Sequence, residues 1–126
     1  MLNASRLSII EEAGVAVLTL TEGLEKDEFL ASRLTRAETR RQIKTLSESI
    51  ANLSPQTLSI LAEVDWGGWH TVARQLGADK DAEQDALWFA VCSLVPATLM
   101  WLRVYRTNQP EIFECKPLAG VGGARP

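Results

Sequence analysis

Apolar residues recur along most of this chain at spacings of three and four residues, which is the period of an α-helix. The clearest stripe consists of Ile43, Leu46, Ile50 and Leu53. Residues 15–20 form the only stretch that looks like a β-strand, and it continues the helical spacing of the apolar residues before it. The pattern therefore predicts an all-α protein.

Capping and helix-breaking residues divide this pattern into separate helices. Ser54 followed by Pro55 is a strong start signal, because proline at the first helical position loses no backbone hydrogen bond. Asp65 is suited to cap the next helix, and Gly77 marks its end. The predicted helices span residues 4–22, 35–53, 55–62, 66–76 and 81–106.

The first two long helices have several start and stop signals. Ser5 or Asn3 can cap the first helix. Thr35, with Glu38 three residues later, has the form of a capping box and predicts the start of the second. Asp27, which lies between the two helices, is expected to cap only a short turn.

Either Asp79 or Asp81 can cap the last helix, which Pro96 should kink by removing one backbone hydrogen bond. Residues 107–126 are rich in proline and glycine, so they predict a flexible tail with little structure of its own. We therefore expect a bundle domain at 1–106 and a tail at 107–126. Short connections favour an antiparallel, up-and-down arrangement of four to five helices.

The composition fits one globular domain. The chain has 126 residues, of which 46% are hydrophobic, enough for a substantial core. Its net charge of −3 argues against a broad nucleic-acid surface, but it leaves room for a local basic patch. Four tryptophans are many for this length and are interpreted as core packing, with a place at an interface as the alternative.

The expected location is the cytoplasm. Charged residues interrupt the early apolar stretch, so no signal peptide is predicted, and Cys92 and Cys115 are interpreted as free thiols in a reducing compartment. A single disulfide between them is the alternative. Residues 86–102 carry no charge, which fits a central core helix, although a membrane anchor is the competing interpretation.

Few residues carry recognisable chemistry. His70 is the sole histidine, no Cys/His spacing suits a metal, and no glycine-rich phosphate loop occurs, so neither metal nor cofactor is predicted. The one basic cluster consists of Arg33, Arg36, Arg40, Arg41 and Lys44. It is either a solvated helix face or a patch that contacts phosphate or an acidic partner.

Several short segments occur in a characteristic order and spacing between about Leu7 and Arg103. They are Thr21–Gly23, Asp27–Leu30, Leu46–Ser49, Val64–Trp66, Leu87–Val91 and Leu94–Pro96. Together they resemble the HEPN superfamily and within it the HepT-like proteins. The resemblance implies a helical bundle that forms homodimers, and often a ribonuclease toxin opposed by a minimal nucleotidyltransferase. Family chemistry uses an Arg, usually followed by Asn, then a His four to six residues on and a Tyr two beyond.

This chain departs from that motif. Arg74 matches the arginine, but Gln75 stands where Asn is common, and Asp79 and Asp81 fall at about the His and Tyr positions. A carboxylate repels RNA phosphates and is a poor general acid at neutral pH. His70 lies one helical turn before Arg74 and offers a possible substitute site.

Three functions remain open on the sequence. The first is a degenerate HepT-like protein that dimerises and binds a nucleotidyltransferase without cutting RNA. The second is an active ribonuclease that uses Arg74 with His70 or Asp79. The third is an unrelated structural or regulatory bundle.

Overall fold

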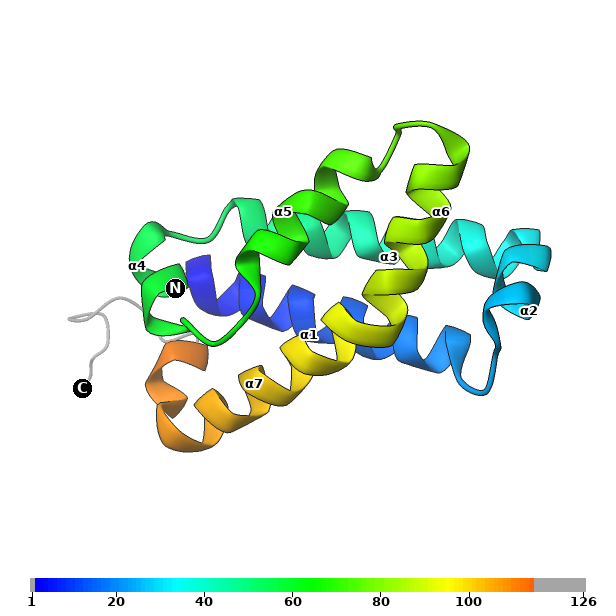
Figure 1. Ribbon diagram of the computed structural model, residues 1–126. Coiled ribbons are helices and arrows are strands. Elements are labelled where there is room, and N and C mark those ends of the chain that lie inside the picture. Colours follow the sequence, from blue (N-terminus) through cyan, green and yellow to red (C-terminus); the bar gives the residue numbers. More distant parts are fainter. Residues whose placement is uncertain (1, 115–126) are drawn as a thin grey trace.

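The computed structural model describes residues 2–114, and every element in that range is helical, which confirms the all-α prediction (Figure 1). Lys26–Ala31 is a short α-helix where only a turn was expected. The helices are α1 (Leu2–Thr21), α2 (Lys26–Ala31), α3 (Arg33–Ala51), α4 (Pro55–Ile60), α5 (Trp66–Gln75), α6 (Lys80–Phe89) and α7 (Val95–Asn108). A π-helical turn, η1 (Ala90–Leu94), joins α6 to α7, and a 3-10 turn, η2 (Pro110–Phe113), follows α7.

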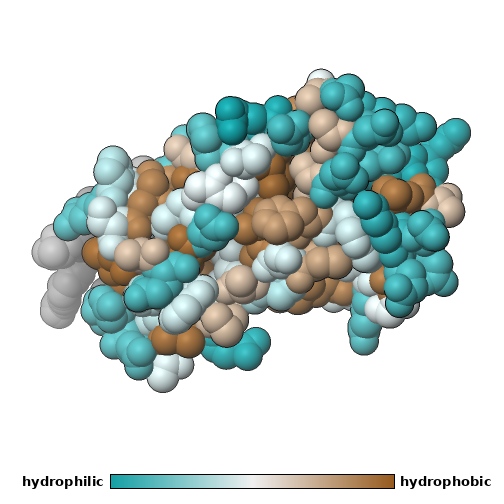
Figure 2. Space-filling view, in the orientation of Figure 1, coloured by the Kyte–Doolittle hydropathy of each residue, from teal (hydrophilic) through white to brown (hydrophobic). Residues whose placement is uncertain are grey.

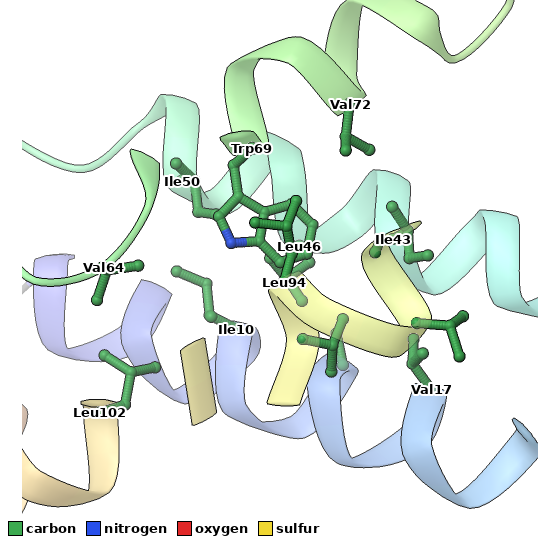
Figure 3. Close-up of a cluster of buried hydrophobic side chains, with 14 of the residues drawn as sticks. Ile10, Val17, Ile43, Leu46, Ile50, Val64, Trp69, Val72, Leu94 and Leu102 are labelled. Carbon is green, nitrogen blue, oxygen red and sulfur yellow. The ribbon is translucent and has the colours of Figure 1, made fainter. Parts of the chain in front are cut away.

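The bundle is built around α1, which packs antiparallel to α3 on one side and to α7 on another (Figure 1). Alternate turns of α1 place Leu7, Ile10 and Val17 in the core, each with no exposed surface. Trp69 enters this core from α5 and lies among side chains of α1, α3 and η1 (Figure 3). A single hydrophobic core therefore holds all the long helices together.

Local capping chemistry fixes several helix ends where the sequence predicts them. Ser54, Asp65 and Asp79 each accept a hydrogen bond from a backbone N–H three residues later, at 3.1, 2.8 and 2.9 Å. Gly23 and Gly77 follow α1 and α5 with positive φ values of 78° and 86°, a conformation that favours glycine.

The predicted capping box at Thr35 is wrong. The cap is Ser32, whose hydroxyl accepts a hydrogen bond from the Thr35 N–H at 3.4 Å, so the helix begins at Arg33. Glu38 instead pairs with Arg41. The reciprocal pattern lies further upstream, where the Glu25 N–H donates to the Glu28 carboxylate at 2.8 Å and starts α2.

The predicted irregularity before Pro96 takes the form of a π-helical turn. In η1 the Val95 N–H donates to the Ala90 carbonyl, five residues back. The chain changes direction here, so α6 and α7 run at a clear angle to each other in Figure 1. The extra residue accommodates the proline, which has no N–H to donate to Cys92.

The folded domain continues past the predicted boundary at residue 106. Helix α7 reaches Asn108, and η2 turns the chain back so that Phe113 is 8% exposed against the core. The Arg106 guanidinium lies over the Phe113 ring, 4.5 Å from its centre. The rest of the predicted tail, with Cys115, lies outside the described residues.

The apolar segment 86–102 lies within the continuous helix Lys80–Asn108. One face of that helix is buried in the core through Leu87, Leu94 and Leu102. By length and composition the helix is also able to cross a membrane, and 39% of its most apolar window is buried inside the protein. In Figure 2, the side of the molecule that faces the viewer has hydrophobic surface in its middle and hydrophilic surface at the end near α2.

Candidate functional site

Three of the predicted site residues, Arg40, Lys44 and His70, line a groove between α3 and α5, which we call the α3–α5 groove. It consists of two adjoining hollows of about 430 and 340 Å³. Both hollows are lined by Ser47, Ala51 and Ala73. The first also has Arg40, Lys44, Glu48, Leu76 and Gly77, and the second has Ile50, Leu58, Trp66, Gly67, Trp69 and His70.

Helical spacing explains which side chains line this groove. On α3, Arg40, Lys44 and Ser47 recur at steps of four and three residues and share one face. On α5, His70 and Ala73 face them across the groove. The sequence therefore places charged residues at one end of the groove and aromatic residues at the other.

Two tryptophans fix the aromatic end. The Trp69 ring is 1% exposed, and its indole N–H donates to the Thr98 hydroxyl of α7 at 2.8 Å. The Trp66 N–H donates to the carbonyls of Leu58 and Leu61 at 3.2 and 3.0 Å, which ties α5 to α4. Because both donors are satisfied, these rings are a rigid wall of the groove.

Glu83 closes the charged end. Its carboxylate accepts a hydrogen bond from the Arg40 guanidinium at 2.9 Å and another from the Gly77 N–H at 2.7 Å. Partial burial opposes ionisation of Glu83, but these two hydrogen bonds outweigh it and hold the pKa of the carboxyl below its usual range. Glu83 thus links α3, α6 and the turn after α5.

The middle of the groove holds two polar groups that the fold does not use. Ser47 is 8% exposed, and its buried hydroxyl has no hydrogen-bond partner among the residues described. Lys44 is exposed, and within residues 2–114 it forms no ion pair. A buried hydroxyl without a hydrogen-bond partner is costly, so this stretch of the groove is where the fold leaves polar groups unsatisfied.

The basic cluster does not act as one patch. Arg36 donates to the Leu30 carbonyl, which stabilises the turn between α2 and α3. Arg40 is engaged by Glu83, and Arg41 donates to Glu38 at 3.0 Å and lowers the pKa of that carboxyl to about 2, with help from Gln42. Only Lys44 among the four proposed contact residues is free of such a partner in the part of the chain that is described.

The three proposed catalytic residues have different surroundings. His70 lines the α3–α5 groove. Arg74 is exposed in the last turn of α5, about 200° around the helix from buried Val72, so it points away from the core. The Asp79 carboxylate accepts the Ala82 N–H at 2.9 Å and serves as the cap of α6.

No metal site is visible in residues 2–114, since no group of three or more His, Cys, Asp or Glu side chains is close enough to hold an ion. Cys92 is a free thiol on η1. Burial, and then the negative charge of Glu25, raise the pKa of this thiol. A raised pKa lowers the thiolate fraction, so Cys92 is a weak nucleophile.

Sequence reasoning missed Glu83 and Ser47. Glu83 stands in the first turn of α6, where the helix dipole favours negative charge, so its sequence position indicates no further role. Its partner Arg40 lies 43 residues away, and no local pattern connects the two. Ser47 lies on the same helix face as Lys44, at a spacing of three, but only the packing against α5 buries its hydroxyl.

Comparison of the chain with models of known protein families, with curated proteins and with solved structures gives no match.

Proposed function

We propose that this chain is a HepT-like HEPN-domain protein that has lost RNA cleavage, forms homodimers and acts in the cytoplasm by binding a protein partner. By the resemblance described above, that partner is a minimal nucleotidyltransferase. The observation that carries the proposal is the position of Asp79. It stands where the family has its histidine, and its carboxylate is occupied as the cap of α6.

The surroundings of Arg74 support the loss of chemistry. An arginine is suited to bind phosphate, but cleavage of RNA also needs a group that transfers a proton within hydrogen-bond reach. Neither the Arg74 side chain nor the His70 side chain forms a hydrogen bond or ion pair with another residue of the described range. A carboxylate at the family's histidine position repels phosphate instead of binding it.

The α3–α5 groove supports the binding role. Its aromatic wall and apolar floor offer surface for a side chain of the partner, while the exposed Lys44 offers a polar contact. Grooves with an apolar floor and a few polar groups are typical binding surfaces.

A cleavage assay tests the loss of activity. The purified protein is incubated in molar excess with total RNA and with structured transfer RNA, beside the Arg74→Ala variant. We expect intact RNA in both samples. RNA cleavage by the wild-type protein that the Arg74→Ala variant lacks would make the chain a ribonuclease and overturn the non-catalytic role.

A co-purification assay tests the partner. A tagged minimal nucleotidyltransferase from the same source is expressed with the wild-type chain, with Lys44→Glu and with the control Lys80→Glu. Lys80 is equally exposed but lies outside the groove, at the start of α6. We expect capture of the wild-type and Lys80→Glu chains and about tenfold weaker capture of Lys44→Glu. No capture of the wild-type chain would remove the partner from the proposal.

A further inference from the structure

A second groove lies between α1 and α7, which we call the α1–α7 groove. It has a volume of about 540 Å³, and its apolar part includes Val15, Leu18, Leu99 and Met100. Leu99 lies directly against the backbone of α1, because Gly14 has no side chain: a Cβ there would be 2.9 Å from the Leu99 methyl carbon. The two helices therefore approach closely and form a continuous floor.

The apolar residues of this groove are unusually exposed. Val15 is 56% exposed and Met100 is 46% exposed. Both residues lie inside long helices, α1 and α7, so their side chains are exposed in the folded protein. A contiguous apolar surface of this kind with a polar rim is typical of a protein interface.

One acidic and one basic residue lie on the rim. Neither Glu22 nor Arg103 has an ion-pair partner among the described residues. By contrast, Glu11 of α1 and Arg106 of α7 form an ion pair with each other across the same two helices. The groove thus satisfies one charge pair internally and leaves one charge of each sign available.

The two free charges lie toward opposite ends of the groove. Helices α1 and α7 are antiparallel, as the Glu11–Arg106 pair and Figure 1 show. Glu22 is seven residues from Val15, a distance of about 10 Å along α1. Arg103 is four residues from Leu99, about 6 Å along α7 in the opposite direction. Val15, Leu99 and Arg103 also line the adjoining hollow near Arg106, so Val15 and Leu99 lie near the middle.

We propose that the α1–α7 groove is the face through which two copies of this chain associate, about a two-fold axis near Val15 and Leu99. This axis exchanges the two ends of the groove and brings Glu22 of each copy opposite Arg103 of the other. Two intermolecular ion pairs then flank a shared apolar centre. The inference rests on the homodimer in the proposed function and assigns it a surface.

A second copy fits this face better than other occupants. An isologous interface requires a patch that is complementary to itself, and one acid and one base at opposite ends of an apolar strip meet that requirement. Glu22 and Arg103 carry opposite charges, so the groove has no net attraction for an anionic lipid surface. The face uses no residue of the α3–α5 groove, so a dimer of this kind keeps both copies of that groove open.

Sedimentation equilibrium over a range of protein concentrations tests the proposal. We expect a reversible dimer for the wild-type chain and a monomer for Val15→Glu/Met100→Glu. Each of Glu22→Arg and Arg103→Glu should raise the dimer dissociation constant about tenfold, because like charges then face each other. The double variant Glu22→Arg/Arg103→Glu should restore it to about the wild-type value.

Two controls separate the interface from general effects. Arg33→Glu and Glu63→Arg reverse exposed charges away from the groove and should leave the dimer unchanged. Circular dichroism should show the same helix content in all variants. All the substituted groove residues are at least partly exposed, so the fold is expected to tolerate them.

The possible failures can be told apart. A dimer that persists in every variant places the interface elsewhere, which overturns this inference but leaves the proposed function intact. A wild-type monomer at all concentrations removes the homodimer from both, while the RNA and partner assays still stand. A monomer that binds neutral phosphatidylcholine vesicles, and loses this binding in Val15→Glu/Met100→Glu, would reassign the face to lipid.

Discussion

The two grooves of this small bundle use their charges in opposite ways. In the α3–α5 groove, Glu83 accepts hydrogen bonds from the Arg40 guanidinium and from the Gly77 N–H, so the charges hold helices together. In the α1–α7 groove, Glu22 and Arg103 have no such partner within the described part of the chain. The charged end of the α3–α5 groove is thus engaged in internal pairing, whereas the charges at the two ends of the α1–α7 groove are available to a partner.

The difference teaches that a cluster of charges in the sequence does not by itself mark a functional surface. Four of the basic residues proposed for phosphate or partner contact lie on α3, and three of them stabilise the fold. Two isolated charges far apart in the sequence, Glu22 and Arg103, are the ones left available. Four sets of substitutions test this comparison, from the largest expected effect to the smallest.

Trp69→Ala should damage both sides of the molecule at once. The ring forms the wall of the α3–α5 groove, and its N–H holds α7 through Thr98. Removing a buried tryptophan costs about 3–5 kcal/mol of unfolding free energy. Urea unfolding followed by circular dichroism measures it. Trp69→Phe keeps most of the volume and should lose only about 1–2 kcal/mol, and equal losses for the two variants would contradict this account.

Gly68→Ala should be destabilising, whereas Gly67→Ala should not. A Cβ at residue 68 would lie 2.8 Å from a Leu94 methyl carbon and 2.6 Å from an Asp65 carboxylate oxygen, so the buried Leu94 side chain and the Asp65 side chain that caps α5 must move. We expect a loss of about 1–2 kcal/mol after the gain in helix propensity. At residue 67 the nearest atom is 3.7 Å away, and alanine should stabilise by up to about 1 kcal/mol. Thermal unfolding of both variants measures the contrast.

Glu83→Gln should weaken the charged end of the α3–α5 groove and lower the free energy of unfolding by about 1 kcal/mol at pH 7. The expected loss is small because Arg40 is partly exposed and solvent screens the pair. The folded-state pKa of Glu83 is lowered, so its contribution is fully present above the unfolded-state pKa and is lost as the pH falls through the folded value. The gap between wild type and variant in urea unfolding should therefore narrow below about pH 4. A gap that is constant down to pH 2 would exclude this cause.

Glu22→Gln and Arg103→Gln should change the free energy of unfolding by no more than about 0.5 kcal/mol, because neither side chain has an internal partner. Both should still weaken self-association. Unfolding at a concentration where the chain is monomeric separates the two effects. A loss of stability similar to that of Glu83→Gln would show that these charges are used internally after all.

Much of the fold could be predicted because helix signals are local. The caps at Ser54, Asp65 and Asp79 each involve a donor only three residues away. The error at Thr35 arose because Ser32 offers the same chemistry one turn earlier, and both choices satisfy the same local rules. The end of the domain was placed too early, since Phe113 finds its place only when η2 packs on the core.

The candidate site was less predictable. His70 and Lys44 were identified and do line one groove, whereas Arg74 lies in the exposed last turn of α5 and Asp79 caps α6. The spacing of residues along the chain gives a helix face and no more. Which face meets another helix depends on how the apolar stripes of all the helices fit together.

The sequence by itself determined that this chain is helical, where most of its helices begin and end, and that Asp79 is suited to cap the last long helix. These properties depend on interactions within about four residues. Only the tertiary structure decided that Glu83 holds Arg40 and that Glu22 and Arg103 share a groove. Those outcomes depend on distances in space between segments far apart in the chain, which packing of the common core sets.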